Sequence, residues 1–162
     1  MPARGISVPV NGTARADVET AFDVIVPIDL PRMFRGFGPL PAVVATADQT
    51  GEWDHVGARR VVKLSDGHEA NERITAYDRP RYFAYRVGPF EAGPLRHVVV
   101  EADGEWWFTA RDATSTAIRW TYTVRPRRYA TPVVRLLIAR LWRGYAKRAL
   151  ALAIDEVEQQ QP

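Results

Sequence analysis

From residue 43 to residue 125 the sequence alternates apolar and polar residues in six segments separated by short turns. This period of two is typical of strands that bury one face and expose the other. Short turns such as Asp66-Gly67 favour antiparallel pairing of consecutive strands. We therefore expect an antiparallel sheet over 43–48, 59–65, 68–77, 81–87, 95–111 and 116–125, with a break or bulge near Asp103-Gly104.

The flanking segments predict the rest of the fold. Alternation and helical spacing favour a strand over 6–10, helices over 15–26 and 29–34, and one long helix over 131–158. Because the long helix is the one element able to cover the sheet, we expect the sheet to curl around it and to leave a space between them. The predicted fold is α+β, a single domain over 1–162. It has a curved seven-stranded antiparallel sheet wrapped around a long C-terminal helix, with two short helices after the first strand.

The composition excludes several classes of protein and site. The chain has 162 residues and no cysteine, so disulfides and thiolate metal sites are excluded. The apolar runs are too short to span a bilayer and the first residues lack the apolar core of a signal peptide, so we expect a cytoplasmic protein. The three histidines form no H-x-H or H-E-x-x-H pattern, and no glycine-rich loop opens a helix. We therefore expect neither a metal nor another cofactor.

Positive charge is concentrated near the C-terminus. Residues 125–148 hold eight of the 22 Lys and Arg residues and no acid, which leaves 14 cations beside all 19 acids elsewhere. A solvated helix face is the simplest interpretation, while contact with a membrane surface or an acidic partner stays open. Aromatic residues are not interleaved on this face, so nucleic-acid binding is not expected. A homodimer also stays open.

Three stretches of the sequence resemble a known family. They are VETAFDVIVPIDLPRMF after the first strand, ITAYDRPRYFAYRV with its Asp-x-Pro step, and GEWWFTARDATSTAIRWTYTVRPR as the last hairpin. In these, the chain resembles the SRPBCC superfamily, which includes START lipid-transfer domains and polyketide cyclase/dehydrase proteins, over about residues 6–157. The resemblance implies the helix-grip fold and a deep apolar cavity for a hydrophobic small molecule, with catalysis in only some branches.

Strand parity and helical spacing predict which side chains line the space. If Trp120 faces the helix, alternate positions on its own and neighbouring strands do the same. The resulting set is rich in aromatic rings with polar tips, which suits a mostly apolar ligand with a few oxygens. The alternative is that these rings fill the core. The expected ligand-binding residues are Arg60, Glu72, Phe83, Tyr85, Trp106, Phe108, Trp120, Tyr122, Leu141 and Tyr145.

Glu72 is the polar residue that stands out within a strand, because its parity groups it with Ala70 and Ile74. A carboxylate in apolar surroundings has a raised pKa and can act as a general acid or base. Two alternatives stay open, namely that a twist or bulge turns Glu72 outward or that it pairs with Arg60 on the facing strand. An inward Arg60–Glu72 pair would orient a ligand carboxylate or hydroxyl.

Further candidates for proton transfer are His97, Tyr122 and Tyr145. His97 follows a loop rich in proline and glycine at the expected cavity mouth, where a histidine can transfer protons near neutral pH. An ordinary surface histidine is the alternative. The rim is expected to include the segment 53–57 and the rings of Phe34, Phe37 and Phe90, unless these rings tuck into the core.

These observations lead to two functional hypotheses for the cavity, and the basic helix face adds a third, the delivery of a ligand to a membrane or a partner. The first is a protein that binds a hydrophobic small molecule, such as a lipid, a polyketide or an aromatic compound, between the sheet and the C-terminal helix. The alternative is an enzyme of the polyketide cyclase or dehydratase type that uses a Glu, His or Tyr of the cavity for proton transfer.

Overall fold

Strands account for much of the computed structural model, which describes residues 4–161. The ends of the predicted domain, residues 1–3 and 162, lie outside the described residues. The strands are β1 (Ile6–Ala14), β2 (Val43–Ala47), β3 (Arg59–Leu64), β4 (Glu69–Asp78), β5 (Tyr82–Val87), β6 (Val99–Asp112) and β7 (Ser115–Pro126). They form one antiparallel sheet in the order β1-β7-β6-β5-β4-β3-β2. The predicted seven-stranded antiparallel sheet is confirmed.

Helical segments lie between β1 and β2, before β6 and after β7 at the C-terminal end of the chain. They are α1 (Val18–Ile25), η1 (Leu30–Arg32), η2 (Pro94–His97), and the C-terminal run of η3 (Arg128–Ala130), α2 (Thr131–Leu137), η4 (Ile138–Trp142) and α3 (Arg143–Gln159). The long terminal helix predicted over 131–158 is therefore confirmed, but it contains the π-helical turn η4, which the sequence did not indicate. Within residues 4–161, no helix combines the length and the apolar character needed to cross a membrane.

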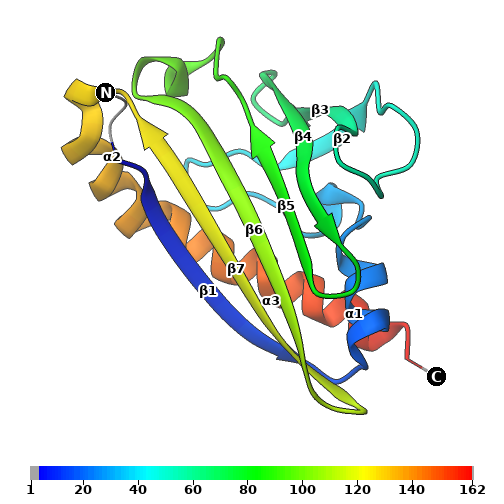
Figure 1. Cartoon of the computed structure of the whole chain (residues 1–162). Coiled ribbons are helices and arrows are strands. Elements are labelled where there is room, and N and C mark those ends of the chain that lie inside the picture. The colour runs from blue at the N-terminus through cyan, green and yellow to red at the C-terminus, as the bar shows by residue number, and fades with distance from the viewer. Residues whose placement is uncertain (1–3, 162) are drawn as a thin grey trace.

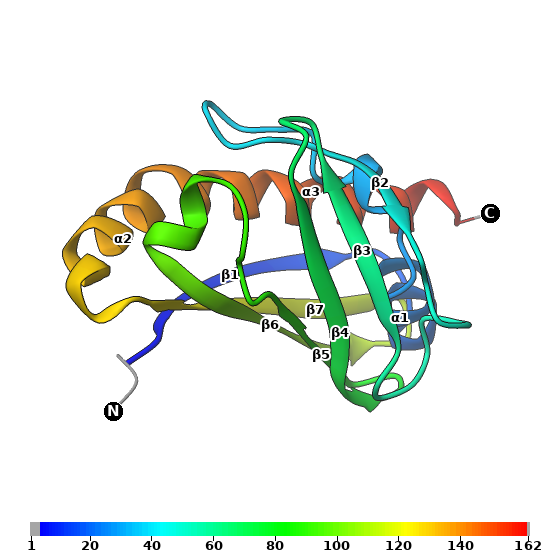
Figure 2. The same ribbon diagram turned by 90° about the horizontal axis from the view of Figure 1, so that it is seen from above.

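The sheet curves around the C-terminal helix, as the predicted helix-grip fold requires (Figures 1 and 2). At its C-terminal half the helix lies close to the sheet, because α3 presents Ala149 and Ala153, both fully buried, to the interior. The facing strand β1 carries Gly12, where a β-carbon would lie 2.5 Å from Cδ1 of Ile154. Small residues on both elements thus hold α3 tightly against β1.

The first helix, α1, begins directly after the residue that caps it. Asp17 is its N-cap and accepts a hydrogen bond from the backbone N–H of Thr20 at 2.9 Å, so the helix starts after Asp17 rather than at residue 15 as expected. Its apolar side packs inward, and Phe22 makes an edge contact with Phe108. The second predicted helix, 29–34, is the shorter 3-10 turn η1.

Strand β6 runs without interruption through residues 103 and 104, so the expected break there is wrong. Gly104 pairs with Tyr85 on one side and Tyr122 on the other. The register shifts of β6 lie nearer its ends, between Val99 and Glu101 and between residues 110 and 112. The glycine marks a close approach of a neighbouring ring and not a bulge.

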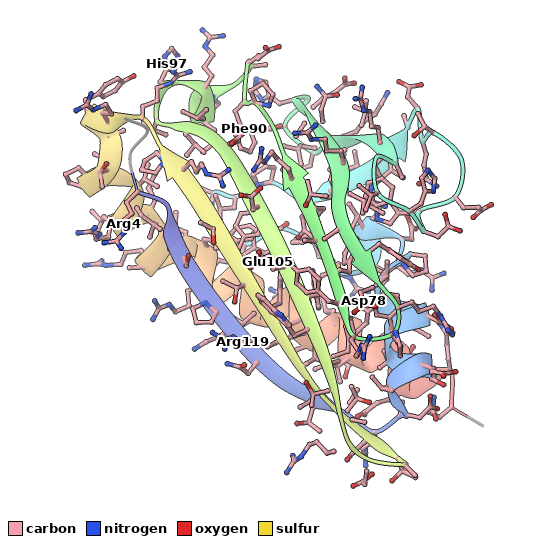
Figure 3. All side chains as sticks on the ribbon, in the orientation of Figure 1. Arg4, Asp78, Phe90, His97, Glu105 and Arg119 are labelled. Carbon is pink, nitrogen blue, oxygen red and sulfur yellow. The ribbon has the colours of Figure 1, made fainter. Side chains whose placement is uncertain are left out.

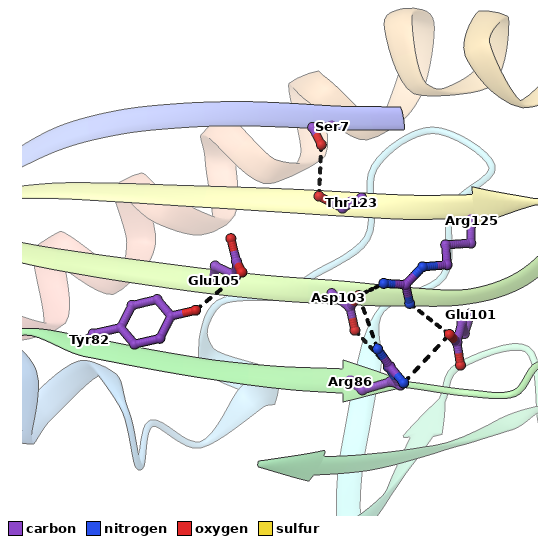
Figure 4. Close-up of polar contacts among 8 residues, drawn as sticks. All are labelled: Ser7, Tyr82, Arg86, Glu101, Asp103, Glu105, Thr123 and Arg125. Carbon is purple, nitrogen blue, oxygen red and sulfur yellow. Dashed lines mark hydrogen bonds and ion pairs between the residues drawn. The ribbon is translucent and has the colours of Figure 1, made fainter. Parts of the chain in front are cut away.

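The convex face of the sheet is polar. Arg86 on β5 contacts Asp103 on β6 at 2.8 Å, and Arg125 on β7 contacts Asp103 at 2.6 Å and Glu101 at 2.7 Å (Figure 4). These cross-strand ion pairs fix which parity of each strand faces water. The opposite parity, which includes Ala102 and Tyr85, faces the helix and forms the interior.

Candidate ligand-binding cavity

A cavity of about 240 Å³ lies between the concave face of the sheet and the first half of the C-terminal helix. Six strands, β2 to β7, contribute to its wall, and the helix contributes residues between Val134 and Tyr145. The second half of the helix does not reach it, because the small residues of α3 bring that half into contact with β1. The predicted space between sheet and helix is thus present at one end of the helix only.

Most residues expected to bind a ligand lie in the cavity wall. These are Arg60, Glu72, Phe83, Tyr85, Trp106, Tyr122, Leu141 and Tyr145. Phe108 and Trp120, which were also expected to bind a ligand, are not part of the wall. Phe108 packs under α1 against Phe22, and Trp120 stacks on Trp106 with ring centroids 4.7 Å apart. Both side chains face the interior, as their strand parity predicted. They lie on a part of the sheet where other side chains pack over them.

The polar end of the cavity is built on a cross-strand pair. Arg60 on β3 lies opposite Glu72 on β4, and its Nε and Nη2 donate to the two carboxylate oxygens at 3.3 and 3.2 Å. Both side chains are about 95% buried, with exposed fractions of 5% and 4%. The Arg60 guanidinium also lies 4.0 Å from the ring centroid of Trp53. Of the alternatives left open by the sequence, the structure has the inward-facing Arg60–Glu72 pair.

Burial controls the acidity of this end of the cavity. Desolvation raises the pKa of the Glu72 carboxyl above its ordinary value, and the attraction of Arg60 opposes this shift without cancelling it. Burial also raises the pKa of the Tyr85 and Tyr122 phenols, and the nearby Glu72 adds to both shifts. At neutral pH both phenols are therefore uncharged, and each hydroxyl can donate a hydrogen bond. We call Arg60, Glu72, Tyr85 and Tyr122 the polar cluster.

Tyr145 holds a loop and does not offer a free hydroxyl to the cavity. Its hydroxyl donates to the carbonyl of Pro41 at 2.8 Å and accepts from the backbone N–H of Gly36 at 3.0 Å. Phe37 of the same loop stacks on the Tyr145 ring and lies over Gly144, where a β-carbon would be 2.5 Å from its Cζ. Tyr145 therefore anchors residues 36–41 across the cavity.

His97 lies on η2 at the outer end of the molecule and is exposed (Figure 3). It does not line the cavity, and its Nε2 accepts a hydrogen bond from Nε of Arg96 at 3.1 Å. Phe34 and Phe90 contribute to the wall as the rim prediction proposed, whereas Trp53 is buried beside Arg60. Within residues 4–161, no three His, Asp or Glu side chains are grouped as metal ligands would be.

Several residues of the helix wall were not predicted from the sequence. Leu137, Ile138 and Trp142 all line the cavity, whereas Leu141 and Tyr145 are the helix residues that were expected to bind a ligand. The π-helical turn η4 changes the helical period within this segment, so α-helical spacing does not predict which of its residues face the cavity. The sequence shows that this segment is aromatic and aliphatic, but it does not show that the helical period changes there.

Solved structures with the same fold are only distantly similar in sequence. Truncated norcoclaurine synthase from Thalictrum flavum is 16% identical with a TM-score of 0.67, over 99% of this chain and 98% of that chain. The Zhui aromatase/cyclase from Streptomyces sp. R1128 is 16% identical with a TM-score of 0.67, over 96% and 95%. The di-domain ARO/CYC StfQ of the steffimycin biosynthetic pathway is 13% identical with a TM-score of 0.71, over 97% of this chain and 52% of that chain. At these identities the likeness establishes the fold.

The family of the chain is shown by its match to a sequence model of that family. None of the curated proteins is significantly similar in sequence to this chain. The model described as polyketide cyclase / dehydrase and lipid transport matches residues 6–159, which is nearly the whole chain. The match confirms the resemblance seen in the sequence and agrees with the helix-grip fold of the structure. The chain therefore belongs to the polyketide cyclase / dehydrase and lipid transport family.

Proposed function

We propose that this protein binds a hydrophobic small molecule that carries one or a few oxygen atoms, such as a polyketide, a lipid or an aromatic compound. The observation that carries the proposal is the cavity of about 240 Å³, with its apolar wall and its single polar cluster. An apolar cavity of about 150 Å³ is large enough to bind benzene. The space here suits a larger ring system or a comparable apolar group.

The two parts of the wall have different roles in this proposal. Apolar burial supplies most of the affinity, at ~25 cal/mol per Å² of ligand surface removed from water. The polar cluster supplies orientation, because Arg60 and the neutral phenols of Tyr85 and Tyr122 donate hydrogen bonds to a ligand oxygen. A ligand without oxygen leaves these donors without a partner from the ligand, so the site favours hydroxyl or carbonyl compounds.

The experiment is calorimetric titration of the purified protein with naphthol and with naphthalene, after native mass spectrometry and solvent extraction have identified any molecule that co-purifies. We expect naphthol to bind more tightly than naphthalene, and Tyr122→Phe to reduce that preference. The matched control is Tyr82→Phe, which removes a hydroxyl that donates to Glu105 on the convex face. Failure of both compounds to bind protein that carries no co-purified molecule contradicts the proposal.

A second candidate function is catalysis of the cyclase or dehydratase type. One observation favours it, which is the buried Glu72 with its raised pKa beside Tyr122. Such a carboxyl can hold a proton at higher pH than an exposed one and pass it to a ligand oxygen. The known aromatase/cyclases among the structural neighbours are consistent with this candidate.

Glu72→Gln separates the two candidates, because glutamine keeps the shape of the side chain and cannot transfer the proton. Under catalysis, the variant binds the ligand and loses turnover of a polyketide-like substrate. Under binding alone, it changes affinity moderately and there is no turnover to lose. His97→Ala serves as the comparison, because His97 lies outside the cavity wall and the structure predicts no loss from it.

A further inference from the structure

The outer side of α2 exposes a stripe of large apolar residues. Tyr129 is 75% exposed, Val133 52%, Leu136 57% and Leu137 39%. Their spacing of four, three and one places them along one side of the helical run from η3 into α2. We call these four residues the α2 stripe. Exposed apolar residues that lie next to one another are typical of interaction sites.

The α2 stripe borders the mouth of the cavity. Leu137 belongs to the stripe and also lines the cavity, and Leu95 on η2 lines the cavity while being 37% exposed. The η2 segment lies beside the start of this helical run (Figure 2), where the hydroxyl of Tyr129 on η3 donates to the carbonyl of His97 at 2.6 Å. The cavity therefore opens to the surface between α2 and η2, beside the exposed apolar residues.

Unpaired positive charges continue from this apolar surface. Arg140 lies in η4 and Arg143 begins α3, so both follow the α2 stripe directly along the helical run. Both are exposed, and neither comes within 4.0 Å of an acid in residues 4–161; the same is true of Arg127, Arg128, Arg135, Lys147 and Arg148. Arg125 differs, because Glu101 and Asp103 neutralise it. One acid, Glu91, lies on the loop before η2.

We propose that the α2 stripe docks the cavity mouth onto an anionic phospholipid bilayer. The aliphatic side chains enter the boundary between headgroups and acyl chains, and the arginines contact lipid phosphates. This arrangement brings the opening beside Leu95 and Leu137 to the apolar layer, so that an apolar ligand enters without crossing water.

The charge pattern favours a bilayer over a second copy of the chain. A symmetric dimer through this face brings the arginines of both copies into one interface, and like charges at an interface oppose association. An acidic soluble partner satisfies the arginines but needs apolar pockets for Val133 and Leu136. A bilayer supplies an anionic layer directly above an apolar one, which matches both features with one surface. The proposal does not depend on which molecule the cavity binds.

The experiment measures binding of the full chain to vesicles of phosphatidylcholine alone and of phosphatidylcholine mixed with phosphatidylglycerol. We expect binding only to the mixed vesicles, with release at high salt. At roughly fivefold per cation, the double variant Arg140→Gln/Arg143→Gln should bind roughly 30-fold more weakly. The control variant Arg73→Gln/Arg111→Gln removes the same charge from exposed residues on β4 and at the far end of β6, and it should bind like the wild type.

A second measurement locates the contact directly. Because the chain has no cysteine, Leu136→Cys accepts a single environment-sensitive dye, and Thr114→Cys in the turn between β6 and β7 gives the matched control. We expect a blue shift on mixed vesicles at residue 136 and none at residue 114. Equal shifts at both sites, or equal losses in both double variants, overturn the proposal.

The other occupants of this face give distinct results. If polyglutamate shifts the dye at residue 136 as strongly as vesicles do, the face recognises anionic charge and not a bilayer. If sedimentation shows a dimer that Leu136→Ser dissociates, a second copy covers the face. Either result overturns the proposal, and both can be obtained whether or not the cavity binds naphthol.

Discussion

The ring of Tyr85 lies across the backbone of Gly104 on the neighbouring strand, so that a β-carbon on Gly104 would be 2.5 Å from the Tyr85 hydroxyl oxygen. On its other side Gly104 pairs with Tyr122, the second phenol of the polar cluster. The missing side chain therefore leaves room for the Tyr85 ring between the strands and the cavity. Gly104 is a determinant of the site even though it carries no functional group.

Gly104→Ala should destabilise the protein and misplace Tyr85. Overpacking of a closely packed interior costs about 1–3 kcal/mol in the free energy of unfolding, which urea denaturation measures. The variant should also lose the preference for naphthol over naphthalene, because the Tyr85 hydroxyl moves. Adding Tyr85→Leu should recover part of the stability. A Gly104→Ala variant as stable as the wild type contradicts the packing described here.

Replacing one partner of the Arg60–Glu72 pair should destabilise the protein more than replacing both partners. Arg60→Met leaves the buried Glu72 without its partner and is expected to lower the free energy of unfolding by about 3–5 kcal/mol. Arg60→Met/Glu72→Met replaces both charges with apolar side chains of similar length and should recover most of that loss. Urea unfolding of both single variants and the double variant gives the coupling energy. A loss below about 1 kcal/mol in the single variant, as for an exposed pair, contradicts a buried pair.

Stability should depend on pH through Glu72 with a defined sign. Burial raises the pKa of Glu72 in the folded protein above its ordinary value of 4.5, so the folded state holds this proton more tightly than the unfolded state. The stability of the wild type relative to Glu72→Gln should therefore fall as pH rises from about 4.5 through the raised pKa, and then level off. Unfolding of both proteins across this pH range tests the sign. A relative stability that rises with pH shows that Arg60 outweighs burial.

Tyr145→Phe should loosen the loop at residues 36–41 and leave the fold intact. The substitution removes the hydrogen bonds to the N–H of Gly36 and the carbonyl of Pro41, each with a net value of about 1 kcal/mol. Hydrogen exchange at the Gly36 amide should become faster. Tyr129→Phe, which removes an exposed hydroxyl bonded to His97, should leave exchange at Gly36 unchanged. Unchanged exchange in Tyr145→Phe contradicts the anchoring role.

Local patterns in the sequence were sufficient to predict the fold. The alternation after residue 43 predicts the strands because a period of two has few other structural meanings, and the long helix is the one cover available. Gly104 misled the prediction of β6, because a glycine in a strand indicates either a bulge or a close approach. Which of the two applies depends on Tyr85 in another strand, and local sequence does not contain that information.

The sequence predicted which side chains face the interior of the sheet, but not which of these side chains lie at the cavity. Parity places Trp106, Phe108 and Trp120 on the interior side, yet only Trp106 reaches the cavity, since packing beneath α1 covers Phe108. The orientation of Glu72 stayed open because the twist of β4 decides it. Trp142 lies in the π-helical turn, which has no simple sequence signal.

The central claim is that an apolar ligand enters the space between sheet and helix, and the tryptophan indole N–H signals in a heteronuclear NMR titration with naphthol test it most directly. Trp106 and Trp142 line the cavity, whereas Trp107 is 36% exposed on the convex face. The account predicts that the indole signals of Trp106 and Trp142 shift with saturation while that of Trp107 does not. Titration of Trp107 alone, or no shift at any of the three, would contradict it.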